Sequence, residues 1–272
     1  MNTRKRRFAR FGLTLALPVV LASCITIPLG LPLGTGPAET AEATDGKAAP
    51  SDSPAGDNAR GPTGEPRDVR PDSPFWPLDG WPIGELDTAA NVDYLSDVER
   101  DVVLHLNMAR SNPARYAREF IEPMLDYFNG SLYREPDSPA NFAGIRTQEG
   151  TSAVVEAVRV LQRQDPLPLL YPSRGMSLGA LDHARDQGQT GDVGHQGSDR
   201  SWPADRVNRH GRWQRTVGEN IAYGPDSGRE VVVQLIVDDG VPDRGHRLNI
   251  YSEDYGVVGV ALGSHPRYGT VS

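Results

Sequence analysis

Two histidines and one glutamate, far apart in the sequence, each directly follow a glycine. They are His195, His246 and Glu219. A glycine beside an ionisable residue lets the backbone turn sharply and approach a ligand closely. Metal sites and acid/base sites are assembled from imidazoles and carboxylates that converge from separate segments. These three residues are therefore the candidate site, provided that the fold brings them together.

The same residue types suit two kinds of chemistry. Two neutral imidazoles with one or two carboxylates suit zinc or another divalent cation, which can keep an open position for water or a ligand. Alternatively, His195, Glu219 and His246 are catalytic candidates, acting as base and orienting acid with Ser198 as a nearby hydroxyl. The spacing does not select Ser198. Glu219 could also serve chiefly to hold loop amides and the His195 ring in place.

Charge and composition exclude one large class of partners. The chain has 272 residues and a formal net charge of −8, although its first ten residues carry five Lys or Arg and no acid. The remainder is therefore more acidic still, and we expect no nucleic-acid partner.

Residues 1–23 are typical of a secretory signal peptide, because a short apolar run over residues 11–21 follows the basic start. The run ends in Leu21-Ala22-Ser23-Cys24, which resembles the bacterial lipobox. This pattern predicts lipidation of Cys24, attachment to a membrane and an exported, lipid-anchored place in the bacterial cell envelope. The alternative is a small hydrophobic residue within an ordinary signal peptide. Cys24 is the only cysteine, so no disulfide is expected.

Residues 24–91 are predicted to be the lipidated N-terminus and a disordered tether. From residue 34 onwards Pro, Gly, Ala, Ser, Asp and Glu dominate, and such a stretch cannot bury enough surface to offset chain entropy. A random coil of this length spans roughly 40 Å. Trp76 and Trp81 are candidates for docking onto the domain.

Residues 92–272 are predicted to form one α+β domain. Ser96 and Glu99 suggest a capping box for a helix that ends near Ser111, and Asn112-Pro113 should open a second helix. Residues 123–150 are loop-rich. Further helices should follow the candidate caps Thr151 and Ser152, and then Ser173.

Strands are expected late in the chain, over residues 212–223 and 255–263, in a sheet that is antiparallel. Residues 231–237 are β-branched, as in a buried strand. Ser227 and Glu230 form a second capping-box pattern, however, and favour a helix there.

Several motifs in this region resemble the bacterial branch of the CAP superfamily, the SCP-like domain of cysteine-rich secretory proteins, antigen 5 and pathogenesis-related proteins. The likeness covers nearly all of residues 92–272. The motifs, in order, are Leu106-Asn107-Met108-Ala109-Arg110, Asp182-His183-Ala184, Gly194-His195, Gly218-Glu219-Asn220-Ile221-Ala222-Tyr223-Gly224, Gly245-His246-Arg247-Leu248-Asn249-Ile250 and Val258-Gly259-Val260-Ala261.

The resemblance implies a three-layer α-β-α sandwich with a central, mostly antiparallel sheet. It also implies a cleft with two histidines and two acids. His195, Glu219 and His246 match three of these, and Asp238 falls in the fourth place, where many relatives have the longer glutamate. The family continues through several more apolar residues after the position of Ser272, so we expect a short or truncated final strand.

The resemblance implies a binding module for a small-molecule, lipid or cell-surface ligand. The alternative is a hydrolase of peptide or cell-wall bonds that uses the same cleft, and catalysis is not established. Around the cleft, Arg206 and Arg247 should make ion pairs or carbonyl contacts. Tyr223 should form a wall of the cavity, and His183 should be a partly exposed residue on a helix face.

Overall fold

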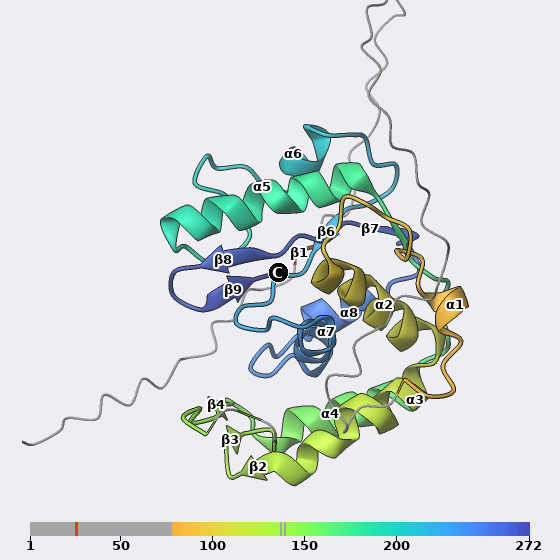
Figure 1. Cartoon of the computed structure of the whole chain (residues 1–272), viewed down its shortest axis with the longest axis vertical. Coiled ribbons are helices and arrows are strands. Elements are labelled where there is room, and N and C mark those ends of the chain that lie inside the picture. The colour runs from red at the N-terminus through yellow and green to blue at the C-terminus, as the bar shows by residue number, and fades with distance from the viewer. Residues whose placement is uncertain (1–24, 27–77, 137, 139) are drawn as a thin grey trace, which may run out of the picture.

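The computed structural model describes residues 25–26, 78–136, 138 and 140–272 (Figure 1). Helices and short strands are mixed along these residues, so the fold is α+β as predicted. None of the helices in the described ranges has the length and apolarity that a bilayer span requires. The signal peptide, Cys24, Trp76 and most of the expected tether lie outside the described residues.

The elements follow one another with short connections. The helices are α1 (Ile83–Leu86), α2 (Asp97–Ser111), α3 (Pro113–Tyr116), a π-helical turn (Ala117–Ile121), a 3₁₀ helix (Glu122–Tyr127), α4 (Thr151–Leu161), α5 (Arg174–Thr190), α6 (Pro203–Asn208), α7 (Gly228–Val237) and α8 (Gly245–Ile250). The strands are β1 (Ile25–Thr26), β2 (Phe128–Asn129), β3 (Leu132–Tyr133), β4 (Ile145–Arg146), β5 (Tyr171–Pro172), β6 (Gly218–Glu219), β7 (Val257–Val258), β8 (Gly263–His265) and β9 (Gly269–Val271).

Helix α2 begins and ends where its sequence signals predict. The Glu99 carboxylate accepts a hydrogen bond from the Ser96 backbone N–H at 2.7 Å, and the Ser96 hydroxyl accepts one from the Glu99 N–H at 3.3 Å. This reciprocal capping box is confirmed. After Ser111 the Asn112 side chain caps α3, with Pro113 at its first position.

Residues 231–237 are helical, so the capping residue is a better guide than the β-branched composition. The Ser227 hydroxyl accepts a hydrogen bond from the Glu230 N–H at 3.3 Å. Helix α7 packs against α2 and is buried on most sides, which explains why it is apolar throughout. For α4, in contrast, the expected caps Thr151 and Ser152 already lie inside the helix, and Gly150 precedes it with φ of 60°.

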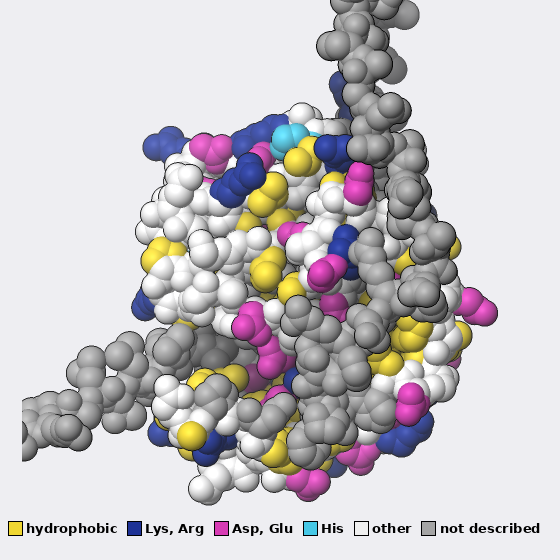
Figure 2. Space-filling model, in the orientation of Figure 1, with side chains coloured by type: hydrophobic (Ala, Val, Ile, Leu, Met, Phe, Trp, Pro, Cys, Tyr) yellow, Lys and Arg dark blue, Asp and Glu magenta, His cyan; other side chains and the backbone are white. Residues whose placement is uncertain are grey.

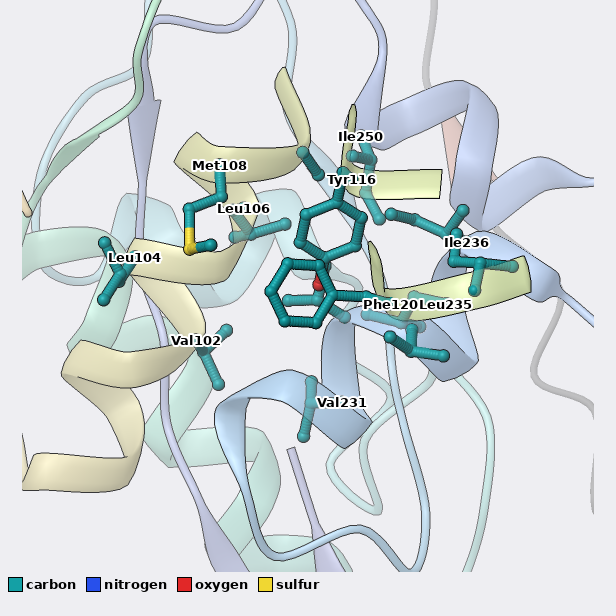
Figure 3. Close-up of a cluster of buried hydrophobic side chains, with 14 of the residues drawn as sticks. Val102, Leu104, Leu106, Met108, Tyr116, Phe120, Val231, Leu235, Ile236 and Ile250 are labelled. Atoms are coloured by element: carbon teal, nitrogen blue, oxygen red, sulfur yellow. The ribbon is translucent and has the colours of Figure 1, made fainter. Parts of the chain in front are cut away.

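The main core lies where α2, α3 and α7 meet. Figure 3 shows the rings of Tyr116 and Phe120 between the side chains of α2 and those of α7. Their centroids are 4.7 Å apart, and both rings are almost completely buried. Burial of each such side chain contributes about 1.5–3 kcal/mol, and this core fixes the two helices next to β6 and α8.

Strands β6 to β9 lie between α5 and α6 on one side and α2, α7 and α8 on the other (Figure 1). The expected long strands are shorter in the structure. Residues 212–223 retain only β6 and a bridge from Tyr223 to Val271, and residues 255–263 retain β7 and the start of β8. The described strands form separate small sheets, antiparallel except for the β5–β7 pair.

Side chains replace sheet hydrogen bonds in the second of these segments. The Val260 N–H donates to the Ser177 hydroxyl at 3.2 Å, and the Leu262 N–H donates to Glu99 at 2.8 Å. Gly259 lies so close to the backbone of Met176 that a β-carbon there would collide with it. Because backbone donors need one partner each, these contacts interrupt the ladder that the alternating sequence predicts.

The packed structure begins before residue 92, where we expected the tether to end. Trp81 docks onto the domain as expected and is 7% exposed. Its indole N–H donates to Glu119 at 2.8 Å, and the Arg115 guanidinium lies 4.2 Å from the ring centroid. Leu86 and Ala89 are also buried, so composition alone overestimated the length of the unpacked stretch. On the face shown in Figure 2, acidic and basic side chains are interspersed.

Buried His105 makes stability depend on pH. Its ring packs against Tyr116 and Phe120 within the core, with Nδ1 3.1 Å from the Tyr116 hydroxyl. Burial, together with the positive charge of Arg229, lowers the pKa of His105 from 6.5 to about 3. Between these values the unfolded chain binds a proton that the folded protein does not bind, so stability falls as the pH falls from 6.5 towards 3.

We expect His105 to contribute a slope of roughly 1.4 kcal/mol per pH unit in this range. The variant His105→Gln should lower stability at pH 7, because it places an amide in the core, but should flatten the slope. Urea unfolding at a series of pH values from 7 to 4 measures this. Equal slopes for the two proteins would contradict the assignment.

Candidate functional site

Glu219 on β6 binds His195 with one carboxylate oxygen and Arg206 with the other. The His195 Nδ1–H donates to Oε1 at 2.8 Å, and the Arg206 guanidinium donates to Oε2 at 2.6 Å. Burial raises the pKa of Glu219, but the hydrogen bond from His195 and the charge of Arg206 outweigh it and lower that pKa below its ordinary value. Glu219 is therefore an ionised acceptor that fixes the His195 ring.

Arg206 on α6 also holds the loop that carries His195. The guanidinium, 2% exposed, donates to the backbone carbonyls of His195 and Ser201, both at 3.0 Å. Its ion pair and carbonyl contacts are as the sequence predicts. A guanidinium can bind in three directions at once, so one side chain ties β6, α6 and this loop together.

Gly194 is held by three side chains. Its φ of +96° suits glycine. Its N–H donates to the Tyr223 hydroxyl at 2.9 Å, and its carbonyl accepts from His183 Nε2 and from Gln187 Nε2, each at 2.8 Å. These bonds fix the backbone immediately before His195.

Two expectations for these side chains are corrected here. His183 is 4% exposed instead of partly exposed, and burial lowers its pKa, which favours the neutral ring. Tyr223 supports Gly194 and is not among the residues that line the cavity described below. Sequence reasoning also missed Gln187, although its i,i+4 spacing from His183 puts both on one face of α5.

The second histidine is bound to the second acid. Asp238 follows α7 with φ of 58°, and its Oδ1 accepts from His246 Nδ1 at 2.6 Å. Its Oδ2 accepts from the backbone N–H groups of His246, at 3.0 Å, and Arg247, at 3.4 Å. The shorter aspartate thus reaches its histidine because the backbone turns back on itself at this residue.

Helix α4 holds the turn between Asp238 and His246 in place. Arg244, with φ of 52°, binds Glu149 through two nitrogens at 2.7 Å and Glu156 at 2.8 Å. Arg247 donates to the same Glu156 oxygen at 2.7 Å, which confirms its expected ion pair. The sequence gave no signal for Arg244, because its two partners lie almost a hundred residues away.

Neighbouring residues of one strand segment hold the two histidines. Glu219 binds the His195 ring, and the next side chain, Asn220, donates to the His246 carbonyl at 3.0 Å. Consecutive Cα atoms are about 3.8 Å apart, so the two histidine-bearing segments meet at β6. The Nε2 atoms of both rings are buried without a hydrogen-bond partner, which is unusual for buried polar atoms.

The donor atoms restrict how a metal could bind. Both oxygens of Glu219 and both of Asp238 already accept hydrogen bonds. Across the described ranges, no group of three or more His, Cys, Asp and Glu side chains could hold a metal ion. The two Nε2 atoms remain as protein donors, with the carboxylates in orienting positions.

Ser198 is bound away from the histidines. Its N–H donates to Asp186 on α5 at 2.8 Å, and its hydroxyl donates to the other oxygen of that carboxylate. The structure thus pairs this hydroxyl with an acid instead of with His195, and the geometry of a nucleophile beside a base is not formed.

A cavity of about 190 Å³ adjoins the site. Glu219, Asn220 and His183 line it, but His195, His246 and Asp238 do not. Most of its walls are apolar side chains from α2, α5, α7 and the segments around β6 and β7. The cavity and the two histidine–carboxylate pairs therefore share the β6 segment but are separate features.

The first site prediction concerns Arg206. In Arg206→Met the buried Glu219 loses its cation, so we expect a loss of about 3 kcal/mol at pH 7 and a rise in the pKa of Glu219. In the wild type, a carboxyl with a lowered pKa stabilises the fold above its ordinary pKa, and this contribution disappears as the pH falls further. The difference between the two proteins should therefore shrink from pH 7 to pH 4 in urea unfolding.

Arg209→Met is the matched control, because Arg209 pairs with Asp199 at the surface and is 42% exposed. It should cost no more than about 1 kcal/mol. A similar loss in both variants would mean that the Glu219 pair does not organise the site.

Comparison with known proteins identifies the family. The family model described as CAP, cysteine-rich secretory protein family, matches residues 132–271, which include both histidine–carboxylate pairs. No curated protein and no solved structure matches the chain. The family match covers half of the chain, and the chain therefore belongs to the cysteine-rich secretory protein (CAP) family.

Proposed function

We propose that this CAP-domain protein is an exported, lipid-anchored binding protein of the bacterial cell envelope, with a three-layer α-β-α sandwich. Its site at His195 and His246 binds a ligand or a divalent cation such as zinc. One observation carries this proposal. Each imidazole is oriented through Nδ1 by a carboxylate, and each Nε2 is buried without a partner.

A neutral imidazole with its Nδ1–H on a carboxylate presents a lone pair at Nε2. This is the arrangement in which histidine binds zinc, and the carboxylate makes the nitrogen a better donor. Zinc with two such ligands would keep positions for water or for a ligand group, whose charge it would polarise. With two protein donors we expect exchangeable binding, weaker than in a four-ligand structural site.

Binding is favoured over hydrolysis by the position of Ser198. Because Asp186 holds both its N–H and its hydroxyl, a hydrolytic reaction would need a different nucleophile. The proposed activity is therefore recognition of a small-molecule, lipid or cell-surface ligand. The donors that recognise it are the two imidazoles, and Arg206 and Arg247 support the loops that carry them.

The proposed anchor rests on the segment Leu21-Ala22-Ser23-Cys24, at the end of the apolar run. Stable attachment to a bilayer requires more than one acyl chain, which a diacylglyceryl group on Cys24 supplies.

Zinc binding by the two histidines can be measured by calorimetry on the purified full chain. His195→Ala and His246→Ala should each weaken binding by at least about tenfold, and Asp238→Asn by about 10–100-fold, because it removes an orienting carboxylate. His210→Ala is the control, since His210 is an exposed residue bound to Asp182. Unchanged affinity in both histidine variants would exclude the proposed site.

Lipidation can be tested by mass spectrometry of protein recovered from bacterial membranes. The N-terminal peptide should begin at Cys24 and carry a diacylglyceryl thioether. Ser23→Gly keeps a small residue before the cysteine and should be processed in the same way, whereas Cys24→Ser should carry no lipid. Cleavage at another residue, or an unmodified Cys24, would overturn the proposed anchor.

A further inference from the structure

The cavity beside β6 has the shape of a missing strand. It lies between two extended segments, residues 217–221 and residues 257–261, every one of which lines it. Helix α5 contributes Met176 and Ala180 to its walls, and α2 and α7 contribute Val102 and Leu235. An apolar slot between two extended segments, with helices on both sides, suits an added β-strand, which pairs through its backbone and buries its side chains.

Part of this slot already has a strand partner in the chain. Strand β1 pairs antiparallel with β6, with Ile25 opposite Glu219 and Thr26 opposite Gly218 (Figure 1). Further along the same segment, Ala222 exchanges two hydrogen bonds with Ser272, at 2.8 and 2.9 Å. Backbone pairing by β9 therefore stops short of β6, and β1 supplies the partner for residues 218 and 219.

The sequence around β1 fits the chemistry of the slot. Residues 24–38 contain no charged side chain, and Ile25-Thr26-Ile27 is a run of β-branched residues. β-branched residues favour strands, and an uncharged segment enters an apolar groove without the cost of burying a charge. Pro28 lacks a backbone donor and so limits the strand to the residues before it.

Gly218 explains why pairing at this place depends on the backbone. A β-carbon at this position would collide with the Tyr255 hydroxyl and would lie 3.0 Å from the Asn249 side chain. β6 is thus held against these groups, which leaves its hydrogen-bonding edge to be covered by another strand. An uncovered edge is a site for strand addition.

We propose that the groove between residues 217–221 and 257–261 is a strand-acceptor site, and that its occupant is the segment of the same chain that contains Ile25 and Thr26. Docking of this segment adds a strand to β6 and covers the apolar walls from α2, α5 and α7. The proposal depends on neither the lipidation of Cys24 nor metal binding at His195 and His246, so either of those can fail without affecting it.

Hydrogen exchange measured by mass spectrometry on the full chain tests this docking. The double variant Ile25→Pro/Thr26→Pro removes both backbone donors of β1, whereas Ile25→Ala/Thr26→Ala keeps them and is the matched control. We expect amides in residues 217–221 to exchange about tenfold faster in the proline variant, and less change in the alanine variant. Amides of α4 should be unaffected and report on the rest of the fold.

A peptide with the sequence of residues 25–31 provides the second measurement. Added to the proline variant, it should restore slow exchange in residues 217–221, and it does so even if that variant is less stable elsewhere. Wild-type exchange in the proline variant, or no protection by the peptide, would overturn the proposal. Protection of the wild type that disappears on dilution would show that a second copy donates the strand, which also overturns it.

Discussion

The ion pair between Arg206 and Glu219 is the interaction on which the histidine site depends. Both groups are largely buried, and a buried carboxylate without compensation would be strongly disfavoured. The same guanidinium holds the carbonyls of His195 and Ser201. As a result, the position of the loop, the orientation of the first imidazole and the charge state of Glu219 are all set by one side chain from α6.

The two histidines are held by similar bonds but in different surroundings. Glu219 shares its charge with a cation, whereas Asp238 accepts from backbone N–H groups in a left-handed turn. The first arrangement relies on a charge that is independent of the local backbone. The second relies on backbone geometry, which Arg244 maintains through its bonds to α4. The site therefore depends on two distant helices, α6 and α4.

Local signals in the sequence predicted the helices and much of the site. Ser96, Asn112 and Ser227 act within three residues of themselves, so their helix starts can be read directly. Motif order likewise located His195, Glu219 and His246, and counting along a helix located Asp238. All four take part in the two pairs that the structure describes.

The remaining features depend on contacts between distant residues. The burial of His183 follows from the turn at Gly194, and the short strands follow from backbone donors captured by Ser177 and Glu99. Trp81 lies in a stretch whose composition indicates disorder, yet it packs because Glu119 and Arg115 meet it from another helix. No pattern within a short window carries this information.

The pairing of β1 with β6 changes the meaning of the long stretch between them and the rest of the fold. Thr26 lies on the domain, and the packed structure resumes at Leu78, so this stretch leaves the domain and returns to it. Its contour length then contributes nothing to reach. An acyl group on Cys24 would emerge beside the groove, and the domain would rest against the lipid surface instead of standing some tens of ångströms away from it.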